Sequence, residues 1–96
     1  MKNLINDIYV EWDDAKEKIN IKKHGISFDT AALVFSDQNR LEFYDEWHSR
    51  DEDRYITIGE VDDVLFVVYT DREEAVRLIS ARVATEEERR LYYGNC

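Results

Sequence analysis

The chain has 96 residues, which suits one compact domain and excludes a Rossmann pair, a TIM barrel or a long repeat array. Its 22 acidic side chains outnumber its 13 basic ones, giving a formal net charge of -9 that argues against general adhesion to nucleic acid. Residues 41–75 hold 12 of the acidic and only 3 of the basic side chains, so one stretch carries nearly all of the surplus.

The first half of the chain predicts one strand followed by two helices. Residues 8–12 alternate and are rich in β-formers, which favours a short strand. Asp13 and Asp14 both offer helix N-caps, Asp14 with a capping-box pattern, and a glycine stop at Gly25 predicts a helix that runs to about Lys23. A second, amphipathic helix is expected over 28–35, because its apolar residues recur at i, i+3, i+4 and i+7.

The second half predicts a meander of strands and a last helix. The expected strands cover 41–44, which has the weakest pattern, then 54–60, 64–69 and 76–84, and a capping box starts a helix over about 85–93. Helices grouped before an antiparallel sheet indicate a single α+β domain over residues 1–96. We therefore expect two N-terminal helices packed on a mainly antiparallel sheet of four to five strands, with a short C-terminal helix.

Strand alternation predicts which side chains of the last strand are accessible. Ser80 and Arg82 share one face and Ile79 lies on the other, so Ser80 and Arg82 look out if the helices cover the Ile79 face. Arg82 also lies beside the last helix, whose Arg89 and Tyr92 can close over the same spot.

Such a cationic and aromatic cluster suits RNA cleavage without a metal. Cations stabilise the pentacoordinate phosphate, an acid and a base move the protons, and an aromatic ring stacks a nucleobase. Arg77 and Ser80 join Arg89 as candidate RNA contacts. The alternative, favoured on the residues alone, is that Arg82 and Arg89 form ordinary surface ion pairs with glutamates 86–88.

The two histidines have no ligand spacing that links them, so no transition-metal site is expected. Lys23 and His24 can present a charge and a titratable group to phosphate, or can simply be favoured by the negative end of the first helix. His48 lies in the acidic loop, where a lone histidine is more often incidental or structural. The acidic side chains lack a fixed coordination pattern, so no metal and no cofactor is expected.

The single cysteine, Cys96, can form no internal disulfide, which suits a reducing compartment. No run of residues approaches the roughly 20 apolar positions of a membrane span. A cytoplasmic protein without a membrane partner is therefore expected.

The chain resembles the BrnT family of bacterial toxins over 9–92. The first half of the resemblance rests on Glu11-Trp12-Asp13-Asp14-Ala15-Lys16, Asn20, Lys23-His24-Gly25, Ser27-Phe28, Ala31, Val34-Phe35 and Asp37. The second half rests on His48-Ser49, Glu52, Arg54, Ile58-Gly59, Val68-Tyr69-Thr70, Ile79-Ser80-Ala81-Arg82, Ala84-Thr85, Glu88-Arg89 and Tyr92.

The resemblance implies a RelE-like fold and a metal-independent ribonuclease toxin of a type II toxin-antitoxin system. It implies RNA as the substrate and a BrnA-type ribbon-helix-helix antitoxin as the partner. It also implies that the toxin contacts operator DNA only through the antitoxin, with which it can form a heterotetramer. Carried over by position, Arg82 is the late-strand catalytic cation and Tyr92 the C-terminal aromatic. Lys23, His24 and Arg54 are further family positions proposed for catalysis.

Two other functions stay open at this point. One is a catalytically weak or inactive module that binds an antitoxin and tunes operon autoregulation, with the acidic stretch 41–75 docking a basic partner. The other is an unrelated α+β domain with no role in nucleic-acid chemistry.

Overall fold

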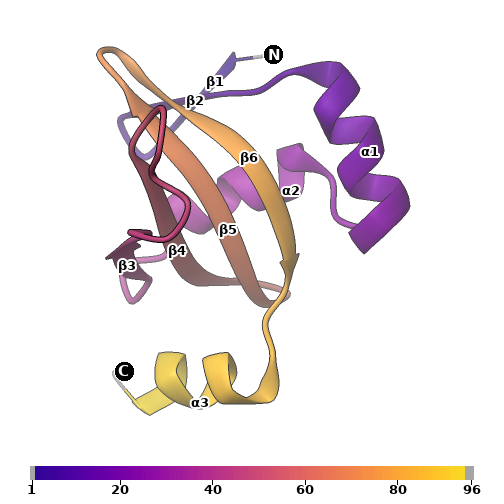
Figure 1. The fold of residues 1–96 in the computed structure, drawn as a ribbon. Helices are drawn as coiled ribbons and strands as arrows, with labels where there is room; N and C mark the ends of the chain where they lie inside the picture. Colours follow the sequence, from indigo (N-terminus) through magenta and orange to yellow (C-terminus); the bar gives the residue numbers. More distant parts are fainter. Residues whose placement is uncertain (1, 95–96) are drawn as a thin grey trace.

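The computed structural model describes residues 2–94, so Cys96 lies outside the described part. In that part, six strands form one sheet in the order β1-β2-β6-β5-β4-β3 (Figure 1). The strands are β1 (Lys2–Ile5), β2 (Ile8–Glu11), β3 (Leu41–Tyr44), β4 (Arg54–Val61), β5 (Asp63–Arg72) and β6 (Ala75–Val83). The helices are α1 (Asp14–His24), α2 (Phe28–Ala32), the 3-10 helix η1 (Leu33–Ser36) and α3 (Glu86–Gly94).

The α+β class is confirmed, but the predicted count of four to five strands is wrong. The additional strand is β1, which forms a hairpin with β2 through Asn6 and Asp7. Both turn residues have positive φ, 49° and 67°, a conformation that asparagine and aspartate tolerate better than most residues. The sheet is mixed, because β2 runs parallel to β6 while every other pair is antiparallel.

Helices α1 and α2 lie on one side of the sheet (Figure 1). Helix α1 begins after Asp13, whose side chain accepts a hydrogen bond from a backbone N–H, and ends at Gly25 with φ 72°. The predicted second helix is α-helical only to Ala32 and continues as the 3-10 helix η1. Between helices and sheet lies the main core, which includes Val10, Trp12, Phe28, Ala31, Val34, Phe35, Leu65, Val67, Tyr69, Leu78 and Ala81.

The alternation predicted for β6 is wrong in its middle. The register against β5 slips between Val68 and Tyr69, leaving Ile79 without a partner between Leu78 and Ser80. This bulge lets Leu78 and Ala81, three positions apart, both face the main core. The helices therefore cover the Leu78 and Ala81 face, while Ile79, Ser80 and Arg82 line the opposite side.

Asn20 of α1 fixes this half of β6, which pairs with β5 on one side but has no strand on the other, because β2 reaches only Val76 and Arg77. The Asn20 amide donates to the Ala81 carbonyl and accepts from the Ala81 N–H, at 2.9 and 3.1 Å. It also donates to the Ile26 carbonyl, at 2.9 Å. One buried side chain thus replaces the missing strand and positions the site-bearing end of β6.

Candidate functional site

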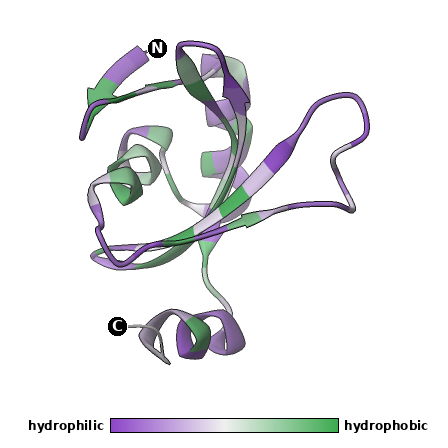
Figure 2. Cartoon of the chain, turned by 90° about the vertical axis from the view of Figure 1, so that its left-hand side faces the viewer, coloured by the Kyte–Doolittle hydropathy of each residue, from purple (hydrophilic) through white to green (hydrophobic). Residues whose placement is uncertain are grey.

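The second face of the sheet, away from α1 and α2, is only partly covered. Helix α3 packs over one end of it and buries a small apolar cluster, consisting of Ile58, Val64, Ala84 and Tyr92. At the other end, the β3–β4 hairpin loop projects from the sheet as a mainly hydrophilic segment (Figure 2). The strand surface between loop and helix is left open.

This open surface is the floor of a cleft of about 400 Å³. The floor is apolar and comes from β4, β5 and β6, namely Ile56, Phe66, Val68 and Ile79. The rim is polar or aromatic, namely Asp45, Trp47, His48, Arg54, Ser80 and Arg82. An apolar concave floor with a few converging polar groups is the usual form of a ligand site.

Arg54 supplies a positive charge at the cleft that no direct ion pair among the described residues engages. It opens β4, and its backbone N–H donates to Ser49 Oγ at 2.8 Å. Its side-chain Nε is buried without a hydrogen-bond partner, and its guanidinium makes no ion pair with any residue in 2–94. A half-buried cation without a direct ion-pair partner favours an incoming anion.

Arg82 is held by α3 in the same cleft. Its guanidinium lies 4.0 Å above the Phe66 ring and donates to both carboxylate oxygens of Glu88, at 2.8 and 3.0 Å. Glu88 also accepts from the Thr85 N–H at 2.8 Å, which completes the predicted capping box. The hydrogen bond from Arg82 is the main cause that lowers the pKa of Glu88 below its usual value of 4.5.

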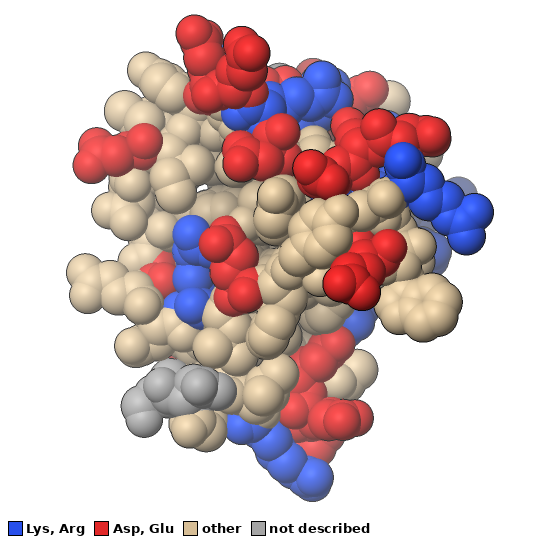
Figure 3. Space-filling model, turned by 60° about the vertical axis from the view of Figure 1, so that its left-hand side comes forward, with Lys and Arg blue, Asp and Glu red and all other residues tan. Residues whose placement is uncertain are grey.

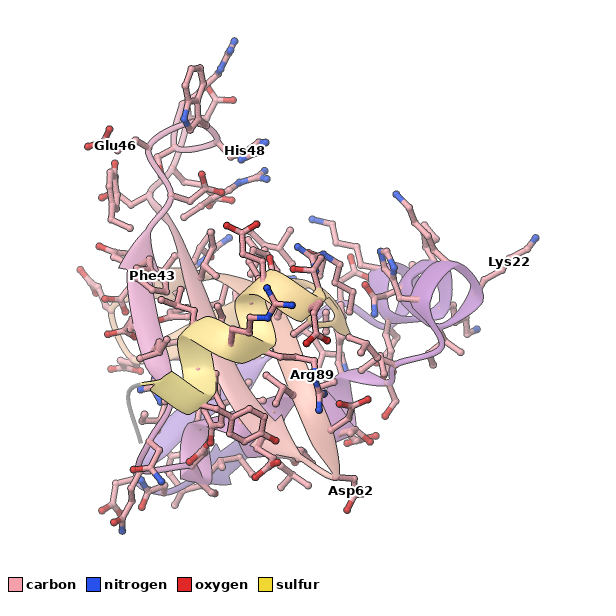
Figure 4. The ribbon with its side chains drawn as sticks, turned by 90° about the horizontal axis from the view of Figure 1, so that it is seen from below. Lys22, Phe43, Glu46, His48, Asp62 and Arg89 are labelled. Carbon is pink, nitrogen blue, oxygen red and sulfur yellow. The ribbon has the colours of Figure 1, made fainter. Side chains whose placement is uncertain are left out.

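His48 faces the cleft from the hairpin loop with a defined orientation. Its Nδ1 lies 2.8 Å from Asp45 Oδ2. A carboxylate only accepts, so Nδ1 carries the hydrogen, and Nε2 is the basic nitrogen of the neutral ring. Figure 4 shows His48 on the projecting loop, on the other side of the molecule from Lys22 of α1. In the described residues no group of three or more His, Cys, Asp or Glu side chains is arranged to hold a metal ion.

Lys23 and His24 line a neighbouring groove of about 180 Å³. The groove runs between α1 and β6, and it shares Ile79 and Ser80 with the cleft. Ser80 therefore borders both hollows. The structure brings Lys23 and His24 to the side of the site, across the edge of β6 from Arg54 and Arg82.

Three other residues of the predicted site lie elsewhere. Tyr92 is the buried residue of α3, 3% exposed, and its hydroxyl donates to Asp37 at 2.5 Å. Arg77 pairs with Glu11 of β2 at 3.1 Å. The predicted closure of Arg89 and Tyr92 over Arg82 is not observed.

Arg89 instead pairs with Asp63 at the β4–β5 turn, at 2.5 Å. The alternative of surface ion pairs with glutamates 86–88 thus holds for Arg82 and not for Arg89. Figure 4 shows Arg89 on α3, away from His48 on the loop.

Sequence reasoning undervalued the hairpin loop, and with it His48 and Trp47. A usable signal was present, because pairing of 41–44 with 54–60 forces the intervening loop over the end of the sheet. The alternation of β4 then puts Ile56 and Ile58 on the same face as the late-strand residues Ser80 and Arg82.

Comparison with known proteins supplies the class. Residues 12–88 match the family model described as "Ribonuclease toxin, BrnT, of type II toxin-antitoxin system". The structure is similar to the 1.1 Å crystal structure of the Brucella abortus ribonuclease toxin BrnT, with a TM-score of 0.66 and 26% sequence identity. That match covers 88% of this chain and 100% of the other chain. No curated protein matches the sequence.

The chain therefore belongs to the class of ribonuclease toxins of type II toxin-antitoxin systems. The match spans well over half of its length, so the chain belongs to the BrnT family. The resemblance seen in the sequence is confirmed.

Proposed function

We propose that the cleft cleaves RNA without a metal ion. The observation that carries the proposal is the meeting of a free Arg54 guanidinium and a carboxylate-oriented His48 on one apolar-floored cleft. Arg82 on the same rim supplies a second cation. These are the groups that phosphodiester cleavage by the adjacent 2′-hydroxyl requires.

In the proposed reaction, Nε2 of His48 takes the proton of the 2′-hydroxyl, and the 2′-oxygen attacks the neighbouring phosphorus. The new bond joins phosphorus to the 2′-oxygen, and the bond to the 5′-oxygen breaks. Arg54 and Arg82 stabilise the extra negative charge of the pentacoordinate phosphate. The leaving oxygen takes a proton from an acid, for which Lys23 and His24 of the neighbouring groove remain candidates.

Ser80, Arg77 and Arg89 remain candidate RNA contacts, and of the three only Ser80 borders the cleft. A catalytic role for Tyr92 also remains a prediction. It requires α3 to move, because Tyr92 is buried and its hydroxyl is bonded to Asp37.

The test is RNA cleavage by purified, partner-free protein in the presence of a chelator. We expect cleavage, and a loss of roughly 100-fold on Arg54→Ala, the effect of removing one transition-state donor. Arg82→Ala should also slow the reaction. Arg90→Ala is the matched control, because Arg90 is an exposed arginine of α3 with a 3.6 Å pair to Glu86. Cleavage that needs an added metal, or that is unchanged by Arg54→Ala, contradicts the proposal.

We further propose that the partner is a BrnA-type antitoxin that brings the toxin to operator DNA, with a heterotetramer as one assembly. The acidic surface supports a basic partner, since complementary charge speeds and selects association. On the face in Figure 3, acidic side chains form several groups with basic ones between them. A RelE-like fold and a cytoplasmic location belong to the same proposal. No described helix is long and apolar enough to cross a membrane.

One observation favours a second candidate function, a weak or inactive toxin that mainly binds its antitoxin. Both carboxylate oxygens of Glu88 are bonded to Arg82, so a phosphate must compete for that guanidinium. Expression of the toxin alone distinguishes the two functions. An active ribonuclease arrests growth, and a binding module does not.

A further inference from the structure

Trp47 is the most exposed large apolar side chain of the described residues, with 85% of its surface accessible. It lies at the tip of the β3–β4 hairpin loop and contributes little to the core. Besides the cleft, Trp47 lines a hollow of about 620 Å³ together with His48, Arg50, Asp51, Glu52 and Arg54. The two hollows share Trp47, His48 and Arg54, so they adjoin at these three residues.

The base of the loop is fixed, which holds this indole beside the cleft. The Asp45 N–H donates to the Arg54 carbonyl at 2.9 Å. Ser49 Oγ donates to the Asp45 carbonyl at 2.5 Å and accepts from the Arg54 N–H at 2.8 Å. These bonds tie both ends of the loop together, so ordering the loop on binding costs little additional entropy.

Two arginines beside Trp47 can hold the phosphates of a nucleotide, and they share the hollow with the carboxylates Asp51 and Glu52. Arg50 is exposed and, like Arg54, makes no ion pair with a described residue. An exposed aromatic ring beside free guanidinium groups is the arrangement that binds single strands, because bases stack on the ring and phosphates lie against the cations.

We propose that Trp47 is a stacking platform for an unpaired base next to the scissile phosphate, which makes single-stranded RNA the substrate. The inference rests on the proposed function, because it places the phosphate at Arg54 and Arg82. A base paired in a duplex cannot splay onto the indole, so duplex RNA binds more weakly. A basic partner protein is the competing occupant, but a ligand on Trp47 continues directly into the cleft that holds His48 and Arg54.

The experiment measures binding separately from cleavage. The probe is a short single-stranded RNA with 2′-O-methyl groups, which lacks the attacking hydroxyl. Trp12 is 3% exposed, so quenching of tryptophan fluorescence by the probe reports on Trp47. We expect quenching by the single strand and much less by the same sequence as a duplex.

Anisotropy of a labelled probe gives the affinities of the variants. Trp47→Ala should weaken binding roughly 5- to 100-fold, the range that the loss of one stacked base produces. Trp47→Phe should restore most of the affinity, because a ring remains. Tyr9→Ala is the matched control, since Tyr9 is a 47% exposed aromatic on β2, away from the cleft.

The outcomes separate this inference from the proposed function. Probe affinity equal in wild type and Trp47→Ala, without quenching, overturns the stacking platform even if the protein cleaves RNA. Weaker antitoxin binding by Trp47→Ala, with unchanged probe binding, also overturns it and assigns Trp47 to a protein partner. Quenching and weaker probe binding by Trp47→Ala support it, even if wild-type protein leaves unmodified RNA intact and the proposed cleavage fails.

Discussion

Replacing Glu88 by glutamine tests the ion pair that joins α3 to the cleft. Glu88 accepts two hydrogen bonds from Arg82 and one from the Thr85 N–H. Glutamine at this position is uncharged. Its amide NH2 group is a hydrogen-bond donor, and the Arg82 guanidinium cannot accept a hydrogen bond. The Glu88 and Arg82 side chains are 20% and 34% exposed, so solvent screens the pair, and the loss is about 1 kcal/mol. In a domain of this size that lowers Tm by about 4–8 °C.

The dependence of this difference on pH gives a sharper check. The pKa of Glu88 is lowered in the folded state, so the pair stabilises the protein above the usual pKa of 4.5. That stability is lost as pH falls through the folded pKa, because a protonated Glu88 resembles glutamine. Thermal unfolding of both proteins should therefore show the full difference at pH 7 and a shrinking difference below about pH 4.5.

The matched control is Glu87→Gln, which removes a charge from an exposed neighbour that pairs with no described residue. Its Tm should stay close to that of the wild type. Two results refute the reasoning. One is an unchanged Tm for Glu88→Gln at pH 7, and the other is a difference that widens as pH falls.

Three further changes test the contacts that shape the fold. Asn20→Ala leaves the Ala81 backbone groups without their partner and should lower the free energy of unfolding, measured with urea, by about 2–3 kcal/mol. A loss of less than about 0.5 kcal/mol contradicts the proposed role of Asn20 in place of a strand. Tyr92→Phe should lower the free energy of unfolding by about 1.5 kcal/mol. Burial acts to raise the pKa of Asp37, but the hydrogen bond from the Tyr92 hydroxyl helps to lower it. NMR titration should therefore show a higher Asp37 pKa in the variant. Gly59→Ala adds a methyl group 3.2 Å from one side-chain carbon of η1, and calorimetry should show a loss of about 1–3 kcal/mol.

Periodicity was enough to predict the elements that bury a regular face. The strands of the meander and the cap of α1 follow from alternation and from residue types with a clear physical role. The hairpin of β1 was missed, although the Asn6-Asp7 pair that closes it tolerates positive φ. The strand β1 is only 4 residues long and half-exposed, so its pattern is weak without its neighbour.

The site was harder to predict because it depends on one irregularity and on a distant loop. A bulge at Ile79 changes which residues of β6 point to each face of the sheet. A prediction from strict alternation does not allow for such an additional residue. Arg82 and Ser80 still reach the accessible face, whereas Tyr92 is used in packing. The Asp45 and His48 contact is made within a loop whose shape follows from strand pairing rather than from local sequence.

The parallel pairing of β2 with β6 has a consequence for synthesis. β2 pairs with β6, which follows the other described strands in the sequence, so this sheet cannot be completed until residues 75–83 have been translated. Ser80 and Arg82 arrive with that strand, and Glu88 follows a few residues later. A chain translated only as far as β5 therefore has no assembled cleft, and any toxicity that depends on the cleft begins only after β6 is available to fold.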